Sequence, residues 1–335
     1  MADWYKDTGF QSDIVLTTRV RLARNLSDFA FPHAIGDDDA RKVIDSVDAS
    51  LKSTNLEFSR KDILSLSPIE RERLVEEHYI SPKLAREKTP SAVFVSADRS
   101  VSIMVNEEDH IRMQAIFAGF ECQRAVDMVS HLDKCMAQSL NYAVHQKYGY
   151  LTSCLTNAGT GMRVSLMMHL PAICKAGIAD KLFSAMGKLG VTVRGMYGEG
   201  SKALGYLFQI SNQMTLGVDE KEITDRLSDV AQQLISKERE LRLALVKQEG
   251  ISLEDKVKRS LGILKSAYLM SSKEMHTLFS NVRLGLSVGL IDDLKPEILN
   301  SLMIETAPAH LTEDMETARD RDAKRAKMIR EKLNL

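Results

Sequence analysis

The sequence has no long hydrophobic run and few residues of the types that mark specialised classes of protein. The longest apolar runs are far too short to span a bilayer, and the N-terminus MADWYKDTGF lacks the basic-then-apolar pattern of a signal peptide. The four cysteines, Cys122, Cys135, Cys154 and Cys174, stand 13 to 20 residues apart without a CxxC pair, which excludes a zinc knuckle and a disulfide framework. We therefore expect a reduced, cytoplasmic protein with no membrane partner and no metal-binding residues.

The sequence also has no large excess of charge of either sign. The formal net charge is −1, so no global basic field favours a nucleic-acid partner. The content of 44% hydrophobic and 27% charged residues is that of an ordinary globular protein, and 335 residues are enough for two domains.

Hydrophobic periodicity and turn residues predict the elements of the first 250 residues. Asp37 to Leu51 is expected to form a helix, and Ser67-Pro68-Ile69-Glu70 is a capping box that begins another. The β-prone runs Ala92 to Ser96 and Val101 to Val105 predict a hairpin. The sequence further predicts strands at 14–18, 191–193 and 206–210, and helices at 121–148, 172–189 and 219–248.

Strand signals nearly vanish after Ile251, and only helical segments follow. These helices are expected to begin near Ser252, Ser271, Pro296 and Glu313. We therefore expect a mixed domain over residues 1–250 and an all-helical domain over residues 251–335.

A glycine turn lies between two β-prone segments, 151–154 and the apolar run that Pro171 closes. Asn157, Gly159 and Gly161 form the turn, and Arg163 follows it. A glycine turn with a cation at its exit is a plausible anion site. The P-loop pattern GxxxxGK[ST] is absent, and most glycine turns of this kind are ordinary connections between strands.

Further charged residues follow other β-prone runs. Arg19 and Arg21 are two residues apart, so in a strand both point to the same side while Val20 and Leu22 face the core. The acidic stretch after the hairpin, Asn106 to Gln114, is either such a strand exit or the first turn of a solvated helix.

Together these positions suggest one site, if the fold brings them together. Arginines around one cleft bind polyphosphate through bidentate hydrogen bonds, and a pair of carboxylates suits a planar guanidinium. This combination suggests phosphoryl transfer from a nucleotide to a guanidino nitrogen. The residues concerned are Arg19, Arg21, Arg112, Arg163, Arg194, Glu108 and Glu199.

Four ordered segments resemble the signature motifs of the phosphagen (guanidino) kinases, in particular the bacterial protein arginine kinases of that family. They are TTRVRLARN, NEEDHIR, LTSCLTNAGTGMR and RGMYGEG, and SPKLAREK, SKALGYLFQISNQMTLG and RDAKRA extend the resemblance over the whole chain. The resemblance implies an α+β fold with a large antiparallel sheet flanked by helices, and ATP with Mg²⁺ as cofactors.

The resemblance also implies roles for individual residues. Glu108 and Glu199 match the paired catalytic carboxylates, with Glu108 as the expected base, and Cys154 matches the substrate-side cysteine, although Leu155 replaces the proline that follows it in the family. The nucleotide positions are Thr17, Thr18, Arg19, Val20, Arg21, His78, Arg112, Arg163, Val164, Ser165, Leu166, Met167, Arg194, Gly195, Met196, Tyr197, Gly198 and Glu199. The RDxxRA motif, with Arg321, Asp322, Arg325 and Ala326, implies an allosteric phosphoarginine site.

The function implied is a protein arginine kinase that marks proteins for degradation by ClpC–ClpP and inactivates heat-shock repressors such as CtsR. A zinc-binding activator, McsA, and a homodimer are implied as well. The TTRVR motif begins at residue 17, so the helical N-terminal domain of the small-molecule members is expected to be missing, which favours a protein as substrate. A small-molecule guanidino kinase and a phosphoarginine-binding adaptor are the alternatives.

Overall fold

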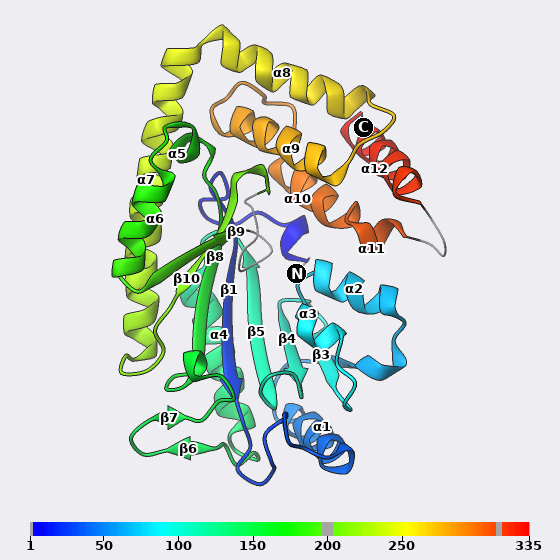
Figure 1. Cartoon of the computed structure of the whole chain (residues 1–335), viewed down its shortest axis with the longest axis vertical. Helices are drawn as coiled ribbons and strands as arrows, with labels where there is room; N and C mark the ends of the chain where they lie inside the picture. The colour runs from blue at the N-terminus through cyan, green and yellow to red at the C-terminus, as the bar shows by residue number, and fades with distance from the viewer. Residues whose placement is uncertain (1–2, 196–203, 313–316, 335) are drawn as a thin grey trace.

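The chain folds around a large antiparallel sheet flanked by helices, as the sequence predicted (Figure 1). The structure is a computed structural model that describes residues 3–195, 204–312 and 317–334. Within these ranges, eight strands form one sheet in the order β2-β3-β4-β5-β1-β8-β10-β9. The strands are β1 (Val15–Arg24), β2 (Phe58–Asp62), β3 (Ala92–Ser96), β4 (Val101–Val105), β5 (Ile111–Ala118), β8 (Met162–His169), β9 (Val191–Gly195) and β10 (Leu207–Asn212), and β6 (Val144–His145) pairs separately with β7 (Gly149–Tyr150).

Helices lie between the strands and then make up the C-terminal part of the chain. The first group comprises α1 (Asp37–Leu51), α2 (Pro68–Glu76), α3 (Pro82–Ala85), α4 (Cys122–Met136), α5 (Pro171–Lys175), α6 (Ala179–Lys188) and α7 (Glu220–Glu249). The second group comprises α8 (Ile251–Ser266), α9 (Ser272–Ser287), α10 (Pro296–Glu305), α11 (Pro308–Leu311) and α12 (Ala318–Leu333). Short 3₁₀ turns are η1 (Trp4–Lys6), η2 (Ile63–Ser65), η3 (Leu155–Asn157) and η4 (Leu204–Tyr206).

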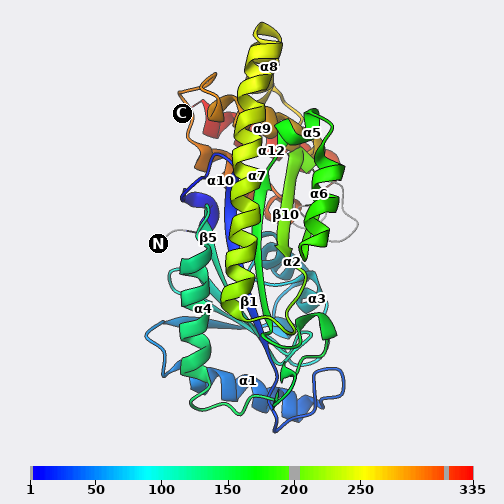
Figure 2. The same cartoon turned by 90° about the vertical axis from the view of Figure 1, so that its left-hand side faces the viewer.

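One face of the sheet is covered by α1, α4 and α7, which bury their apolar sides against it (Figure 2). Side chains alternate along a strand, and Val20 and Leu22 of β1 are fully buried in this core. Arg19 and Arg21, which alternate with them, therefore face the other side of the sheet, as the sequence predicted.

The C-terminal helices pack on part of this second face. Ile116, Met167 and Leu207 project from β5, β8 and β10 and share a core with residues of α9 and α10, to which Trp4 of η1 also belongs. Gly250, with a φ of +48°, separates α7 from α8 and lets the chain change direction. This break supports the proposed division of the chain near residue 250.

Several expected elements differ in the structure. The helix expected over 121–148 ends at Met136, because the next segment turns back to form the β6–β7 hairpin. The helix expected over 172–189 is interrupted at Gly177, whose φ of +69° is left-handed. The segment 151–154 is not a strand, whereas the mostly polar edge strand β2 has too little alternation to be recognised in the sequence.

The helix considered for the acidic stretch is wrong, since residues 106–110 form the loop of the β4–β5 hairpin and β5 begins at Ile111. The tight loop is made possible by Asn106, which adopts a φ of +57°. In the C-terminal region, α9 and α10 begin at the expected positions, α8 begins at Ile251, and the helix expected near Glu313 is α12, which begins at Ala318.

Candidate active site

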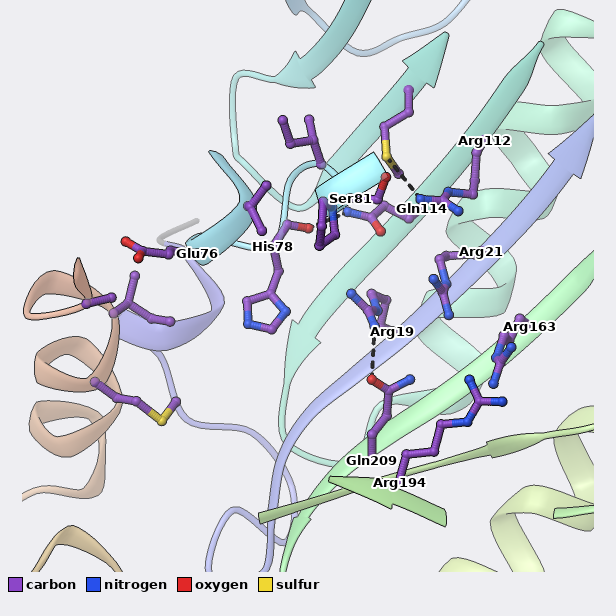
Figure 3. Close-up of a pocket in the computed structure, with 17 residues that line it drawn as sticks. Arg19, Arg21, Glu76, His78, Ser81, Arg112, Gln114, Arg163, Arg194 and Gln209 are labelled. Carbon is purple, nitrogen blue, oxygen red and sulfur yellow. Dashed lines mark hydrogen bonds between the residues drawn. The ribbon is translucent and has the colours of Figure 1, made fainter. Parts of the chain in front are cut away.

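The arginines that the sequence singled out line one cavity of about 280 Å³ on the second face of the sheet. They come from separate strands, and Figure 3 shows their guanidinium groups turned toward a common space. Arg19 and Arg21 lie on β1, and Arg112, Arg163 and Arg194 lie on β5, β8 and β9. The expected convergence of these five side chains is therefore present in the fold.

The register of the central strands places two of these cations directly opposite each other. Arg21 of β1 pairs with Arg163 of β8 on one side and with Gln114 of β5 on the other. Like charges at directly opposed positions of a sheet destabilise the pairing. The central strands thus concentrate positive charge at one place on the sheet.

Burial and mutual repulsion lower the pKa of two of these arginines, Arg19 and Arg21. Burial, and then the neighbouring Arg112 and Arg163, lower the pKa of Arg19 to about 10. The pKa of Arg21 is lowered well below its ordinary value, by burial first and then by Arg19, Arg112 and Arg163. The buried Nε atoms of Arg21 and Arg112 have no hydrogen-bond partner within the protein. A multivalent anion would supply the missing acceptors and relieve the repulsion.

Polar neighbours fix the orientation of three of the guanidinium groups. Arg19 Nη2 donates to Gln209 Oε1 at 3.3 Å, and Arg163 Nη2 donates to Ser211 Oγ at 3.0 Å. Arg112 Nη1 lies 3.0 Å from the carboxylate of Glu107. The cavity is therefore shaped before any ligand enters, which reduces the entropy lost on binding.

His78 also lines the cavity, and its main chain has an unusual conformation. It follows α2 with a φ of +68°, and the bonds from His78 N to Val75 O and from Tyr79 N to Leu74 O form a Schellman motif. Glycine usually takes this position, so a histidine there is strained. Burial and the nearby Arg19 lower the pKa of His78 to about 3, so its imidazole is neutral at physiological pH.

The acidic β4–β5 loop presents two neighbouring glutamates in different surroundings. Glu107 is 4% exposed, accepts a hydrogen bond from Ser81 Oγ at 2.5 Å, and pairs with Arg112. Glu108 is partly exposed, and its main-chain nitrogen donates to Glu107 Oε2 at 3.0 Å. Glu107 thus connects the loop to the arginine cluster, whereas Glu108 is not among the residues that line the cavity.

The loop that carries Cys154 is joined to the acidic loop. Asp109, which is 1% exposed, accepts 2.6 Å hydrogen bonds from Ser153 N and from Asn25 Nδ2. The Sγ atom of Cys154 lies 2.9 Å from Thr156 Oγ1. The fold therefore brings the segments of Glu108 and Cys154 together. Leu155, which follows, is 87% exposed.

The glycine turn itself does not line the cavity. At Gly161, with a φ of +67°, a Cβ atom would lie 2.6 Å from Ala23 O, and at Gly159 one would lie 2.3 Å from Thr215 O. These glycines allow close packing against β1 and the segment after β10. Arg163 is the residue of this segment that reaches the cavity.

The remaining expected nucleotide residues have varied environments. The side chains of Val20, Val164 and Leu166 are in the core on the opposite face of the sheet, and Thr18 Oγ1 donates to Gly119 O there. Thr17, Ser165 and Met167 are buried, and Met167 packs against the C-terminal helices. Gly195 ends β9. The expected residues Met196, Tyr197, Gly198 and Glu199 lie outside the described residues.

The residues expected to bind phosphoarginine lie on α12. Arg325 is 2% exposed and donates to Thr306 O, Met270 O and Asp322 Oδ1 at 3.0, 2.8 and 2.6 Å. Ala326 is buried in the C-terminal core, whereas Arg321 is partly exposed. Arg325 thus holds helices of this domain together, and Arg321 is the more accessible of the two arginines.

Sequence reasoning missed several residues that shape the cavity. Glu107 was passed over in favour of Glu108, although it pairs with Arg112. The amides Gln114 and Gln209 gave no signal in the sequence. Gln114 lies two residues after Arg112 on β5, and Gln209 lies two residues after Leu207 on β10, so each points to the same side of its strand as that residue. The contribution of α10, through Met303 and Ile304, required the tertiary structure.

The described residues contain no group of three or more His, Cys, Asp or Glu side chains placed to hold a metal ion. Among the helices of residues 3–195, 204–312 and 317–334, none is both long and apolar enough to cross a membrane.

Comparison with known proteins agrees with this geometry. The catalytic C-terminal domain of ATP:guanido phosphotransferases matches residues 40–241, and the McsB protein-arginine kinase C-terminal domain matches residues 250–335. The protein-arginine kinase of Halalkalibacterium halodurans is 44% identical over 100% of this chain and 96% of its own length. That of Syntrophomonas wolfei is 45% identical, over 98% and 93%.

A crystal structure of lombricine kinase has the same fold, with a TM-score of 0.64 and 22% identity over 72% of each chain. The family match over residues 40–241, with which this fold agrees, places the chain among the ATP:guanido phosphotransferases. Given the matches over its full length, the chain belongs to the protein-arginine kinase family within that class.

Proposed function

We propose that this protein transfers the γ-phosphoryl group of ATP to guanidino nitrogens of arginine residues in proteins. The observation that carries the proposal is the cavity lined by five arginines, which the Glu107–Arg112 pair joins to the loop of Glu108. Polyphosphate and guanidinium have opposite charges, and the two regions offer opposite charges to match. The relatives named protein-arginine kinase support an arginine in a protein as the acceptor.

The residues suggest a direct transfer. A guanidinium stays protonated up to a pH of about 12, so it must lose a proton to become a nucleophile. Glu108 accepts this proton, the nitrogen forms a bond to the γ-phosphorus, and the bond from that phosphorus to the bridging oxygen of ADP breaks. Glu199 is proposed to hold the guanidinium in line, and Cys154 to lie beside it.

The arginines act on the other reactant. They bind the phosphates and neutralise the charge that builds up on the phosphoryl oxygens in the transition state. Mg²⁺ is the divalent cation we propose, and when bound it neutralises phosphate charge. Positioning of the two substrates supplies a large part of the rate, since alignment is worth up to roughly 7–11 kcal/mol.

The regulatory and cellular roles are proposals that rest on the family. Arg321 and its neighbours on α12 are proposed to bind phosphoarginine, with Arg321 as the contacting residue because Arg325 is committed to main-chain carbonyls. A homodimer, the activator McsA, the repressor CtsR and delivery of marked proteins to ClpC–ClpP are proposed as the cellular context. The cytoplasmic location stays a prediction from the sequence.

The test is incubation with Mg·ATP and an arginine-rich protein, followed by mass spectrometry under non-acidic conditions that preserve the N–P bond. We expect phosphate on arginine side chains of the protein. Transfer to free arginine alone would establish a small-molecule guanidino kinase instead. Absence of transfer to either acceptor, with phosphoarginine still bound, would favour an adaptor.

A further inference from the structure

The cavity has two chemically different ends. Its cations come from the sheet, whereas most of its apolar lining, apart from Met104 of β4 and Pro82 of α3, comes from the end of α2 and from α10 with the segments that follow these helices. Figure 3 shows Glu76 and His78 at one side, and Arg112 and Arg163 at the other, with Arg19 between. Such a division suits a ligand with one charged and one flat, apolar part.

The apolar end is shared between the two parts of the chain. The catalytic part contributes Val75 and Ile80, and the C-terminal part contributes Met303, Ile304 and Ala307. Met303 and Ile304 line the cavity but are only 4% and 2% exposed, so nearly all of their remaining surface is packed against other protein atoms. Apolar walls with a few polar groups are typical of sites that hold a nucleobase.

The segment from the end of α10 to α11 is held from both sides. The carboxylate of Glu76 on α2 accepts from Ala309 N at 2.9 and 3.1 Å, and Arg73 Nε donates to Ala309 O at 2.9 Å. On the other side, Arg325 of α12 donates to Thr306 O at 3.0 Å. The wall next to the cavity is therefore fixed in position rather than loosely apposed, which lowers the entropy cost of binding against it.

We propose that the C-terminal domain completes the nucleotide site, with Ile304 and Ala307 forming the wall against which the base packs. The inference rests on the proposed function, since it assumes that the arginines bind the phosphates. It extends that function, because it makes the helical domain part of the nucleotide site.

The proposal separates the base from the phosphates, so two ligands test it. Inorganic triphosphate needs only the arginines, whereas the non-hydrolysable analogue AMPPNP also needs the wall. Both are titrated, in the presence of Mg²⁺, into the full-length protein and its Ala307→Phe variant by calorimetry. Ala307 has φ −67° and ψ 156° and precedes Pro308, a conformation that phenylalanine adopts without strain.

We expect Ala307→Phe to lower the affinity for AMPPNP by about tenfold or more, because an aromatic ring there occupies the space of the base. The affinity for triphosphate should stay within about twofold of that of the unaltered protein. Ala307→Leu should give a smaller loss of the same kind. Ala318→Phe makes the same change at an exposed position of α12 away from the cavity and should alter neither affinity.

Other results would overturn the proposal in distinguishable ways. Unchanged binding of both ligands in Ala307→Phe would show that the base lies elsewhere while the phosphate site stands. Equal losses for both ligands would show a general disturbance and not a base contact. Failure of the unaltered protein to bind either ligand would remove the proposed function together with this inference.

Discussion

Asp109 accepts a hydrogen bond from the main-chain nitrogen of Ser153 at 2.6 Å, and this bond joins the acidic β4–β5 loop to the loop that carries Cys154. The same carboxylate oxygen accepts from Asn25 Nδ2. Burial raises the pKa of Asp109 above its ordinary value, because desolvation disfavours the charged carboxylate. The hydrogen bonds from Ser153 and Asn25 stabilise the charged form and offset part of this effect. Two loops on which the proposed chemistry depends therefore share one anchor.

Replacing Asp109 by alanine should detach the two loops. The buried donors of Ser153 and Asn25 lose their acceptor, which costs about 1–3 kcal/mol of stability. We expect kcat for phosphoryl transfer to fall by about tenfold or more while the affinity for AMPPNP changes little, since the arginine cavity is untouched. Steady-state kinetics and calorimetry measure both quantities.

Asp109→Asn is the matched control, because its amide oxygen can accept from the same two donors. It should recover most of the stability and activity lost in Asp109→Ala. If the asparagine variant were as impaired as the alanine variant, the charge of Asp109 would matter more than its role as an anchor.

Glu107 and Glu108 are neighbours with separable roles. Glu108→Gln should lower phosphoryl transfer by about 100-fold or more, because the amide cannot accept the proton, and leave the affinity for AMPPNP within about twofold. Glu107→Gln should weaken nucleotide binding, since Arg112 loses the charge that orients it. Loss of AMPPNP affinity in Glu108→Gln would contradict the assignment of this carboxylate to the guanidinium side.

The cross-strand pair of Arg21 and Arg163 predicts a conflict between stability and binding. Arg21→Met removes a like charge at a directly opposed cross-strand position and should raise the unfolding free energy of the ligand-free protein by about 0.2–1 kcal/mol. The affinity for inorganic triphosphate should fall by at least about tenfold, since a charge-assisted hydrogen bond is worth about 1.5–3 kcal/mol. Thermal unfolding with and without triphosphate measures both effects.

Arg60→Met serves as the control for this experiment. Arg60 lies on β2 outside the cavity and pairs with Asp45 and Asp62 at the surface. This variant should bind triphosphate normally and gain no stability. A gain equal to that of Arg21→Met would attribute the effect to the methionine rather than to the opposed arginines.

His78 allows the main chain and the side chain to be tested separately. His78→Gly relieves the strained φ of +68° and should be more stable than His78→Ala by about 1 kcal/mol. Both variants lack the imidazole, so both should bind AMPPNP more weakly and to the same extent. Urea unfolding and calorimetry give these comparisons, and a glycine variant with full affinity would exclude a role for the ring.

Glu76 predicts a dependence of stability on pH. Burial raises the pKa of Glu76 from 4.5 to about 7, so the folded protein binds the proton more tightly than the unfolded chain. The stability that this group contributes to the folded protein is fully present below pH 4.5 and is lost as the pH rises toward about 7. Glu76→Gln does not titrate, so its unfolding free energy should fall less between pH 5 and 7.5 than that of the unaltered protein. If urea unfolding showed the same fall in unfolding free energy with pH for both proteins, the raised pKa of Glu76 would be refuted.

Alternation along β1 is a property that the sequence determined by itself. The spacing of Arg19 and Arg21 put both on one side, and Val20 and Leu22 on the other, because side chains of a strand alternate whatever its neighbours are. The limits of α1 followed from its acidic first turn and periodicity, and the beginning of α2 from its capping box. The class of reaction also followed from the sequence, through the ordered motifs around the arginines and glutamates.

Only the tertiary structure decided which residues meet. Strand order and register place Arg21 against Arg163, and these depend on pairings between residues more than 140 positions apart that no local pattern encodes. The same holds for the Asp109–Ser153 bond and for Ile304 and Ala307 at the apolar end of the cavity. The sequence names the groups that carry charge, whereas packing between distant segments sets their distances, and the chemistry of the site depends on those distances.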